Sequence, residues 1–445
     1  MPQQNTNTSA STRSVLDSFF KLHQKNTNVK TEVIAGLTTF LTMVYIVFVN
    51  PNVLGVAGMD TKAVFVTTAL IAAIGSIAMG LFTNLPIALA PAMGLNAYFA
   101  FTVVSDLGHS WQVAMGAVFL GALCLFILTV VRVRYWIMNS IPISLRIGIT
   151  SGIGLFIALI GFNNSGIVVA SPATLVKLGD FKSIPFILGL LSFFLIVILA
   201  HKKVHSAVLI SIIITTLIGL IVDPDVKYFG IVSMPPSISS VVGHVDIKGA
   251  LNVSLLSIIF VFMLINLFDS SGTLIGVTNK AGMTQSDGSF PNMQKALVVD
   301  SSSSMLGGLL GTSSVTAYIE SSSGTSVGGK TGLTSIVTGL MFLIVLFFSP
   351  LVSLVPPYAT AGALIYVGVL MTSSLTEVQW DDLTEAVPAF IATVMMPFTY
   401  SITEGVAFGF FSYCLMKIGT GKFRSLNPCV IIVSLLFLAK FIFID

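Results

Sequence analysis

Four carboxylates lie within or at the edge of long apolar stretches of this sequence: Asp269, Asp300, Glu320 and Glu404. Placing an acid at the centre of a membrane helix costs about 2.5–3.5 kcal/mol on insertion scales. No Lys or Arg is expected deep enough within these stretches to neutralise them. Because intramembrane acids usually carry protons or bind substrates, these four are the first candidates for function.

Two of the four are predicted to touch a substrate. Asn266, Asp269 and Thr273 would share one face of a helix, and this polar stripe on an apolar helix would face a cavity. Glu320 directly follows the string 315–319 of another stretch. The alternative for Asp269 and Glu320 is a hydrogen-bonded structural acid. A carboxylic acid in a dry site can exchange a proton, which suits proton coupling.

The other polar residues of these stretches are predicted to act without contacting the substrate. Asp300 begins a serine run, 300–304, and is expected to support the binding residues or to join helices. Asp300, Asn266 and Thr273 are therefore candidates for proton coupling or for indirect support of the site. Glu404 falls at a predicted outer hairpin, where we expect it to cap a helix.

The elements that carry these residues are predicted to be membrane helices. The chain has 445 residues, of which 55% are hydrophobic and 9% charged, and its mean hydropathy is +0.97. Soluble domains carry about 25% charged residues. The composition therefore argues against a soluble enzyme, a disordered protein and a nucleic-acid binder, and the continuous apolar runs argue against a β-barrel. Its three cysteines lie in or beside apolar segments, so no disulfide framework is expected.

Fourteen spans are predicted, because each needs about 20 mostly apolar residues. They fall near residues 33–50, 64–82, 86–104, 112–131, 147–163, 184–200, 206–222, 252–272, 293–311, 314–328, 332–349, 354–372, 387–402 and 405–418. The apolar run at 427–443 is either a further span or a helix lying on the membrane. A cytoplasmic N-terminus places most Lys and Arg, Arg134 among them, in inner connections, as the positive-inside rule requires. Residues 1–30 would form a polar cytoplasmic tail without a cleavable signal.

The spans divide into two sets of seven, 31–222 and 251–418, separated by a polar outer loop at 223–250 and followed by an apolar segment at 419–445. The string 95–99 in the third span resembles 315–319 in the tenth. Seven is odd, so two such repeats would be inverted in the membrane. Pro and Gly residues break both spans, and the freed backbone must meet protein or a watery cavity. The alternatives are a chance match and close packing through small residues.

Other functional patterns are weak. The string 324–331 fits the phosphate-loop pattern, but it connects two membrane spans instead of a strand and a helix of a soluble domain. The five histidines fall in the tail, loops or span ends, which does not favour a metal site. No nucleophile and base converge within one span. We therefore expect no cofactor, no metal and no enzymatic activity.

Four strings, at 36–51, 90–101, 266–276 and 311–321, resemble the AzgA-like branch of the nucleobase–cation symporters, within the xanthine/uracil permease superfamily. The string at 90–101 places the chain closest to the bacterial guanine/hypoxanthine permeases of the inner membrane. The resemblance implies fourteen helices in two inverted seven-helix repeats. Spans 1–4 and 8–11 would form a core domain and spans 5–7 and 12–14 a gate domain. It also implies proton symport by an elevator-like motion and a homodimer through the gate.

The resemblance also implies a binding site. Short extended pieces of spans three and ten would meet there, with Asp269 and Glu320 as the two binding acids. Asn96 and Thr316 would join them, and Tyr98, Phe99 or Phe268 would stack on the flat base. The chain departs from the uracil and xanthine branches at span eight, where Asp replaces the usual Glu. Thr273 stands where those branches often have His, so a proton role for that His is not carried over.

The chemistry of the substrate fits this set. Guanine and hypoxanthine present N1–H, which a carboxylate accepts in a charge-assisted hydrogen bond. Adenine lacks N1–H and would leave the carboxylate unpaired, at a cost of about 1–3 kcal/mol. We expect proton-coupled, high-affinity uptake of guanine and hypoxanthine across the inner membrane. The alternatives are a symporter for adenine, xanthine or urate and, less favoured, a channel or an anion transporter. Partners would be the purine, a proton and membrane lipid, without nucleic acid.

Overall fold

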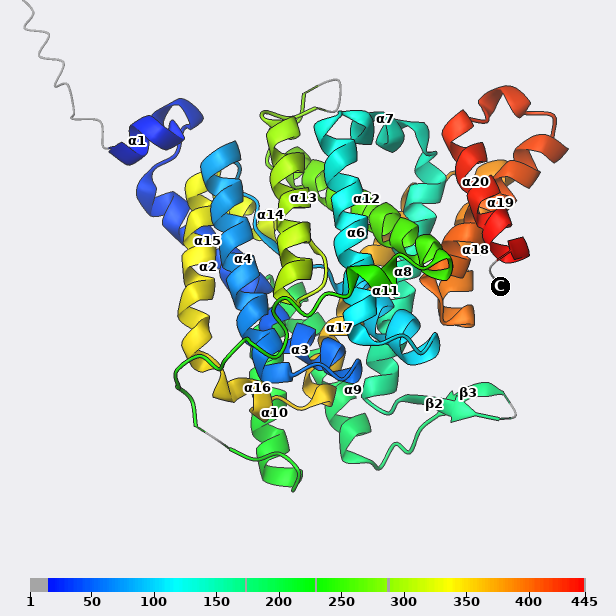
Figure 1. Cartoon of the computed structure of the whole chain (residues 1–445). Helices are drawn as coiled ribbons and strands as arrows, with labels where there is room; N and C mark the ends of the chain where they lie inside the picture. Colours follow the sequence, from blue (N-terminus) through cyan, green and yellow to red (C-terminus); the bar gives the residue numbers. More distant parts are fainter. Residues whose placement is uncertain (1–14, 173, 229, 286–288, 444–445) are drawn as a thin grey trace, which may run out of the picture.

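The computed structural model describes residues 15–172, 174–228, 230–285 and 289–443, which are mostly helical (Figure 1). The elements that match predicted spans one to seven are α2 (Val29–Met43) with α3 (Ile46–Val56), α4 (Thr61–Thr83), β1 (Leu89–Pro91) with α5 (Met93–Ala97) and the π-helical η2 (Tyr98–Asp106), α6 (Trp111–Val130), α8 (Ile143–Asn164), α9 (Ile184–His201) and α10 (Ala207–Val222).

Spans eight to fourteen correspond to the second half of the chain. They are α12 (Val253–Lys280), α13 (Met293–Leu310), β4 (Val315–Ala317) with α14 (Ser321–Ser326), α15 (Gly332–Val345), α17 (Pro357–Thr372), α18 (Leu383–Thr399) and α19 (Ile402–Gly419). Short helices connect some of them: α7 (Val133–Ser140), α11 (Ile247–Ala250) and α16 (Pro350–Leu354). Seven of the described helices are long and apolar enough to cross a membrane, and others are shorter or broken.

The spans run between two faces of the molecule. One, here called the α1 face, carries α1 (Val15–Phe20) and α7; the opposite hairpin face carries the strands β2 (Val168–Ser171) and β3 (Leu175–Leu178) (Figure 1). The β2–β3 hairpin was not predicted from the sequence. It joins α8 to α9, and its four residue pairs are antiparallel.

Helix α12 is longer than the predicted span 252–272 and continues to Lys280. Its last turn ends on polar residues, Thr278–Lys280, yet Val277 and Thr278 are buried, and the Thr278 hydroxyl donates to the Leu274 carbonyl (2.8 Å). This turn packs against protein instead of lipid. Hydropathy therefore underestimated the length of the helix that carries Asp269.

Spans three and ten are broken in mid-molecule, as their Pro and Gly residues predicted. Strands β1 and β4 pair antiparallel there, with Leu89 opposite Ala317 and Pro91 opposite Val315. The strands come from opposite faces of the molecule, and each is followed by a half-helix (α5 or α14). Each strand satisfies backbone groups of the other, which the interior of a membrane protein requires.

The pairing reveals which positions of the two repeats correspond. Ser76 of α4 bonds both backbone groups of Leu89 (3.0 and 3.2 Å), and Ser304 of α13 donates to the Val315 carbonyl. The counterpart of β4 is thus Leu89–Pro91. The register suggested by the strings 95–99 and 315–319 was wrong, because 95–97 is helical where 315–317 is extended. Five residues with only two identities, Ala and Tyr, are too few to fix a register.

The helices pack in two groups. The first contains α2, α3, α4, α6, α12, α13 and α15, and the second contains α8, α9, α10, α17, α18 and α19. The β1–β4 pair belongs to the first group. It approaches the second through α5, where a Cβ added at Gly94 would lie 2.6 Å from the Ile153 side chain of α8.

Both ends of the chain pack onto these groups. Residues 1–14 of the predicted tail lie outside the described residues, but Phe20 and Leu22 are buried against Leu333. The Lys25 ammonium donates to the carbonyls of Asn84 and Lys330 (3.1 Å each). The apolar run 427–443 forms the helix α20 (Pro428–Phe443), which packs on α19. The polar composition of residues 15–28 did not predict this docking.

Candidate functional site

The site is built around the crossing of β1 and β4. Tyr318, which follows β4, donates its N–H to the Ala88 carbonyl (3.0 Å) and its hydroxyl to the Pro91 carbonyl (2.6 Å). The Ala92 N–H donates to the Ser314 carbonyl (2.9 Å). These bonds fix both strands at both ends. The half-helices α5 and α14 therefore begin at defined points of the crossing.

The two predicted binding acids meet the crossing from one side. Asp269 of α12 accepts a hydrogen bond from the Thr316 hydroxyl of β4 (3.5 Å to Oδ2). Glu320, at the start of α14, accepts one from the Tyr45 hydroxyl (2.6 Å to Oε1). Both carboxylates are half-buried. The structure thus brings Asp269, Thr316 and Glu320 together, although they are up to 51 residues apart in the chain.

The surface beside the acids remains open. A Cβ added at Gly272, one turn after Asp269, would meet no atom within 4 Å. Ile319, beside Glu320, is 40% exposed, and Thr273 is half-buried. Helix α14 lies toward the α1 face of the molecule (Figure 1). The exposed surface at Gly272 and Ile319, here called the opening, therefore lies beside the two acids.

Asn96, a predicted binding residue, is buried in a hydrogen-bonded chain. Its side-chain amide donates to the Asn50 carbonyl oxygen (2.5 Å), and Asn50 donates to the Thr68 hydroxyl (2.8 Å). This chain joins α5 to α3 and α4. The Oδ1 atom of Asn96 is buried without a hydrogen-bond partner among the described residues. That oxygen is a free acceptor within α5.

The three predicted stacking residues lie among side chains, and Phe99 is fully buried. Tyr98 is fully buried, shares a hydrogen bond with the Thr403 hydroxyl of α19 (2.7 Å) and packs edge-on against Phe262 (4.9 Å between ring centres). Tyr98 therefore joins the first helix group to the second. Phe268, next to Asp269, is 7% exposed.

Asn266 shares the face of α12 that meets α13 and β4. Its amide donates to the hydroxyls of Ser304 (3.0 Å) and Ser314 (2.8 Å). Ser304 in turn donates to β4. Asn266 thus supports the strand that carries Thr316, while Thr273 lies at the opening.

The expectation that no basic residue pairs with the acids was wrong. Arg134 and Asp300 form an ion pair (3.2 Å) whose side chains are 1% and 0% exposed. The sequence predicts Arg134 in an inner connection, because it follows the predicted span 112–131. In the fold, the short helix α7 carries its side chain back between α12 and α13. Composition and loop counting cannot detect such a return.

Glu404, expected to act as a cap, occupies the first turn of α19, the helix that Ser401 caps. The Glu404 N–H donates to the Ser401 hydroxyl (3.4 Å). The residues Ser401 and Glu404 have the spacing of a capping box.

Sequence reasoning missed a fully buried acid. Glu32 of α2 is 0% exposed and accepts from the Lys330 and Thr331 N–H groups (2.9 and 3.2 Å) and the Thr334 hydroxyl (2.6 Å). It therefore caps α15 from a neighbouring helix. Gly324 packs directly against α2, which leaves no room for a side chain. This contact explains Gly324, and Gly329 likewise lies against Ala35 of α2. Glu32 went unnoticed because it lies one residue before the predicted first span.

Tyr45 and Asn50 were also missed as site residues. Both lie within the string 36–51, so the signal was present, but nothing in the sequence connects Tyr45 with Glu320, 275 residues away. The short break between α2 and α3 places Tyr45 at the bend. There its ring is buried and its hydroxyl reaches the second repeat.

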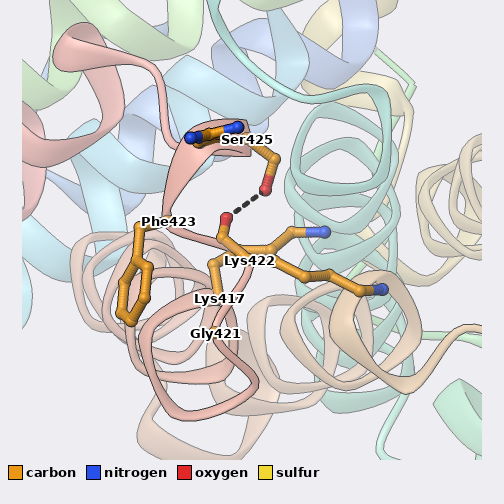
Figure 2. A pocket seen from close by; sticks show the side chains of 6 residues that line it. Lys417, Gly421, Lys422, Phe423 and Ser425 are labelled. Carbon is orange, nitrogen blue, oxygen red and sulfur yellow. Dashed lines mark hydrogen bonds between the residues drawn. The ribbon is translucent and has the colours of Figure 1, made fainter.

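A separate pocket opens near the end of α19, lined by Lys417, Gly421, Lys422, Phe423, Arg424 and Ser425 (Figure 2). Two of its cations are already paired. Lys417 bonds Glu385 (2.6 Å), and Lys422 bonds Asp382 (3.0 Å) and lowers the pKa of that exposed carboxyl. The pocket lies at the rim of the second helix group, away from the strand crossing. It is therefore not the site of the two predicted binding acids.

Comparisons with known proteins agree with a transporter. Residues 30–408 match the xanthine/uracil permease family, described as a permease family. Adenine permeases AdeP and AdeQ of Escherichia coli K12 are 64% and 63% identical over 445 residues, with 100% of each chain covered. Guanine/hypoxanthine permease GhxP of E. coli O157:H7 is 41% identical over 433 residues, 96% of each chain.

Solved structures agree on the fold. The transmembrane domain of the cyanobacterial bicarbonate transporter BicA superposes with a TM-score of 0.64 at 16% identity, covering 85% of this chain and 97% of that one. At this identity the likeness concerns the fold alone. It confirms the predicted membrane fold of two inverted seven-helix repeats.

Proposed function

This chain belongs to the xanthine/uracil permease family, and we propose that it imports purine nucleobases, adenine foremost, together with protons. Its family identifies it as a multi-pass membrane permease of nucleobases. The observation that carries the proposal is the placement of two half-buried carboxylates at the β1–β4 crossing, beside an opening. Flat ligands usually bind through a few convergent polar groups set among apolar side chains.

Adenine is preferred because the chain is 64% identical to AdeP and 63% identical to AdeQ, against 41% to GhxP. The substrate expected from the string 90–101 was guanine and hypoxanthine, and it stays as the second candidate. An ionised Asp269 favours it, because a carboxylate accepts from the N1–H of those bases.

Protonation of an acid reconciles adenine with this site. A neutral carboxyl group donates through its O–H and accepts through its carbonyl oxygen. The corresponding edge of adenine offers N1 as acceptor and the N6 amino group as donor. Adenine therefore pairs with a protonated Asp269 or Glu320, whereas guanine pairs with an ionised one. Adenine and a proton would bind together, which is the basis of symport.

The two helix groups suggest how the site reaches both faces. We assign the first group to a core domain and the second to a gate domain, and the core would slide against the gate as an elevator. The protein would lie in the inner membrane with the α1 face in the cytoplasm, because Lys and Arg concentrate in the connections on that side. The opening beside Gly272 then corresponds to an inward-facing state. A homodimer through the gate remains part of this proposal.

Uptake of radiolabelled adenine tests the proposal, in cells that lack their own purine permeases. We expect uptake that a proton uncoupler abolishes and that excess adenine blocks more strongly than guanine, hypoxanthine, xanthine or uracil. Asp269→Asn and Glu320→Gln should each lose most uptake at matched expression. Tyr228→Phe, an exposed change in an outer loop, serves as the control.

The outcomes separate the candidates. Stronger competition by guanine and hypoxanthine would select the second candidate and reject the protonated-acid pairing. Uptake that persists with the uncoupler would contradict proton coupling. Absence of any purine uptake by the wild-type protein would reject the substrate class.

A further inference from the structure

Arg134 holds one of the least accessible charges in the described structure. It lies in α7, after the fourth span, and its side chain is 1% exposed. The guanidinium spreads its donors over two helices. It bonds Asp300 Oδ2 (3.2 and 3.3 Å) and the Leu297 carbonyl (3.4 Å) of α13, and the hydroxyls of Ser270 (3.1 Å) and Ser271 (3.1 and 3.3 Å) of α12.

Stability alone does not explain this arrangement. Removing two charges from water is costly, and well-packed apolar residues often stabilise a fold as well as a buried ion pair does. A buried pair with several hydrogen bonds does, however, fix geometry. Arginine suits this task because its planar fork presents five donors in set directions.

The bonded groups adjoin the proposed substrate site. Ser270 and Ser271 directly follow Asp269 in the same turn of α12. Asp300 lies one turn before Ser304, which bonds β4 at Val315. The guanidinium therefore holds together the turn that carries Asp269 and the helix that anchors the strand of Thr316.

We propose that Arg134 is a positioning residue of the substrate site, which clamps α12 to α13 and thereby fixes Asp269 against β4. This inference rests on the proposed function. The Arg134 clamp, meaning Arg134 with Asp300, Ser270 and Ser271, acts through Asp269 and does not touch the substrate. The substrate site depends on the directions of the guanidinium N–H donors as well as on the positive charge.

The test compares Arg134→Lys with the double variant Ser270→Ala/Ser271→Ala, in adenine uptake at matched expression. Arg134→Lys keeps the positive charge but loses the planar guanidinium with its five N–H donors. The double variant keeps the ion pair with Asp300 but loses the hydrogen bonds from Arg134 to α12. Each loses several hydrogen bonds to a charged group and should raise the apparent KM at least tenfold, the factor for the loss of one, with a much smaller change in maximal rate. Arg132→Lys, in the same connection but exposed, should change neither. Arg134→Gln is avoided as primary evidence because it leaves Asp300 unpaired and can unfold the protein.

A second readout does not depend on the substrate. Gly272→Cys, in a background with Cys124, Cys414 and Cys429 replaced by Ala, reports the opening beside Asp269 through its rate of thiol labelling. The clamp variants should change this rate several-fold, and Arg132→Lys should not. Wild-type KM and labelling in both clamp variants would overturn the proposal. If the clamp variants alter the labelling rate but the wild-type protein takes up no purine, the role of the Arg134 clamp stands and the proposed function is rejected.

Discussion

At the scale of single residues, the two carboxylates are set apart by their partners. Asp269 has a weak contact with the Thr316 hydroxyl at 3.5 Å, whereas Glu320 has a short bond from Tyr45 at 2.6 Å. Asp300 is neutralised by Arg134. Removing one member of such a buried pair costs about 3–5 kcal/mol, so Asp300 stays bound to Arg134. Of these three acids, Asp269 therefore makes the weakest hydrogen bond within the protein, which favours it as the acid that binds a base and a proton.

Tyr45→Phe should raise the apparent KM for adenine about tenfold, because Glu320 loses a hydrogen bond of about 1.5–3 kcal/mol to a charged group. The phenyl ring fills the same buried space, so stability in detergent should change little. Uptake kinetics and thermal unfolding measure the two effects. Equal kinetics in Tyr45→Phe and in the control Tyr228→Phe would show that this bond does not orient Glu320.

Gly272→Leu should block uptake without destabilising the fold. Nothing lies within 4 Å of a Cβ at this position, so a side chain can extend into the opening beside Asp269. Leucine is also the better helix former, by about 0.5–1 kcal/mol. The measurements are adenine uptake and the melting temperature. Undiminished uptake would mean that substrate does not pass Gly272, and a sharply lower melting temperature would mean that the space is filled.

At the scale of elements, close helix packing holds the broken spans in place. The backbones of helices α4 and α15 are in direct contact. A Cβ added at Gly80 would overlap the carbonyl oxygen of Gly332, and a Cβ added at Gly332 would overlap the carbonyl oxygen of Gly80. Ser335 of α15 donates to the carbonyls of Leu85 and Ile87 (2.8 and 2.9 Å), in the segment that leads to β1. The spacing of α4 and α15 therefore sets where β1 begins.

Gly80→Ala should lower the free energy of unfolding by about 1–3 kcal/mol, the usual cost of overpacking a core. Gly419→Ala is the matched control, since its Cβ meets no atom within 4 Å and also lies in a helix. Thermal unfolding of the purified proteins in detergent measures both. If the two variants melt alike, α4 and α15 are less tightly packed than the structure indicates.

At the scale of the whole molecule, few contacts join the two helix groups near the site. One of them is the hydrogen bond between Tyr98 of η2 and Thr403 of α19 (2.7 Å). A sliding core would have to break this bond in every cycle. By contrast, Ser192 of α9 and Ser211 of α10 lie within one group and share a hydrogen bond (3.2 Å). The two pairs therefore distinguish motion between groups from motion within one.

Cross-linking of Tyr98→Cys to Thr403→Cys with a cleavable thiol reagent should stop adenine uptake, and cleavage should restore it. The background again replaces the three native cysteines by Ala. Cross-linking Ser192→Cys to Ser211→Cys should leave uptake nearly unchanged. Uptake at the wild-type rate by protein fully cross-linked between positions 98 and 403 would rule out an elevator-like motion along this interface.

The sequence by itself determined the membrane class, the span count, the breaks in spans three and ten, and the candidate acids. These follow from hydropathy, helix-breaking residues and the cost of a charge in lipid, which act locally along the chain. The string similarities also identified the family, although they favoured guanine and hypoxanthine where the most similar relatives compared are adenine permeases.

Only the tertiary structure decided how distant segments meet. It paired Leu89–Pro91 with Val315–Ala317, brought Tyr45 to Glu320 and turned Arg134 back from a predicted connection onto Asp300. It also buried Glu32 as a cap for α15 and docked residues 15–28 on the helix ends. Long-range hydrogen bonds and ion pairs depend on which helices become neighbours, and hydrophobic periodicity does not record that choice.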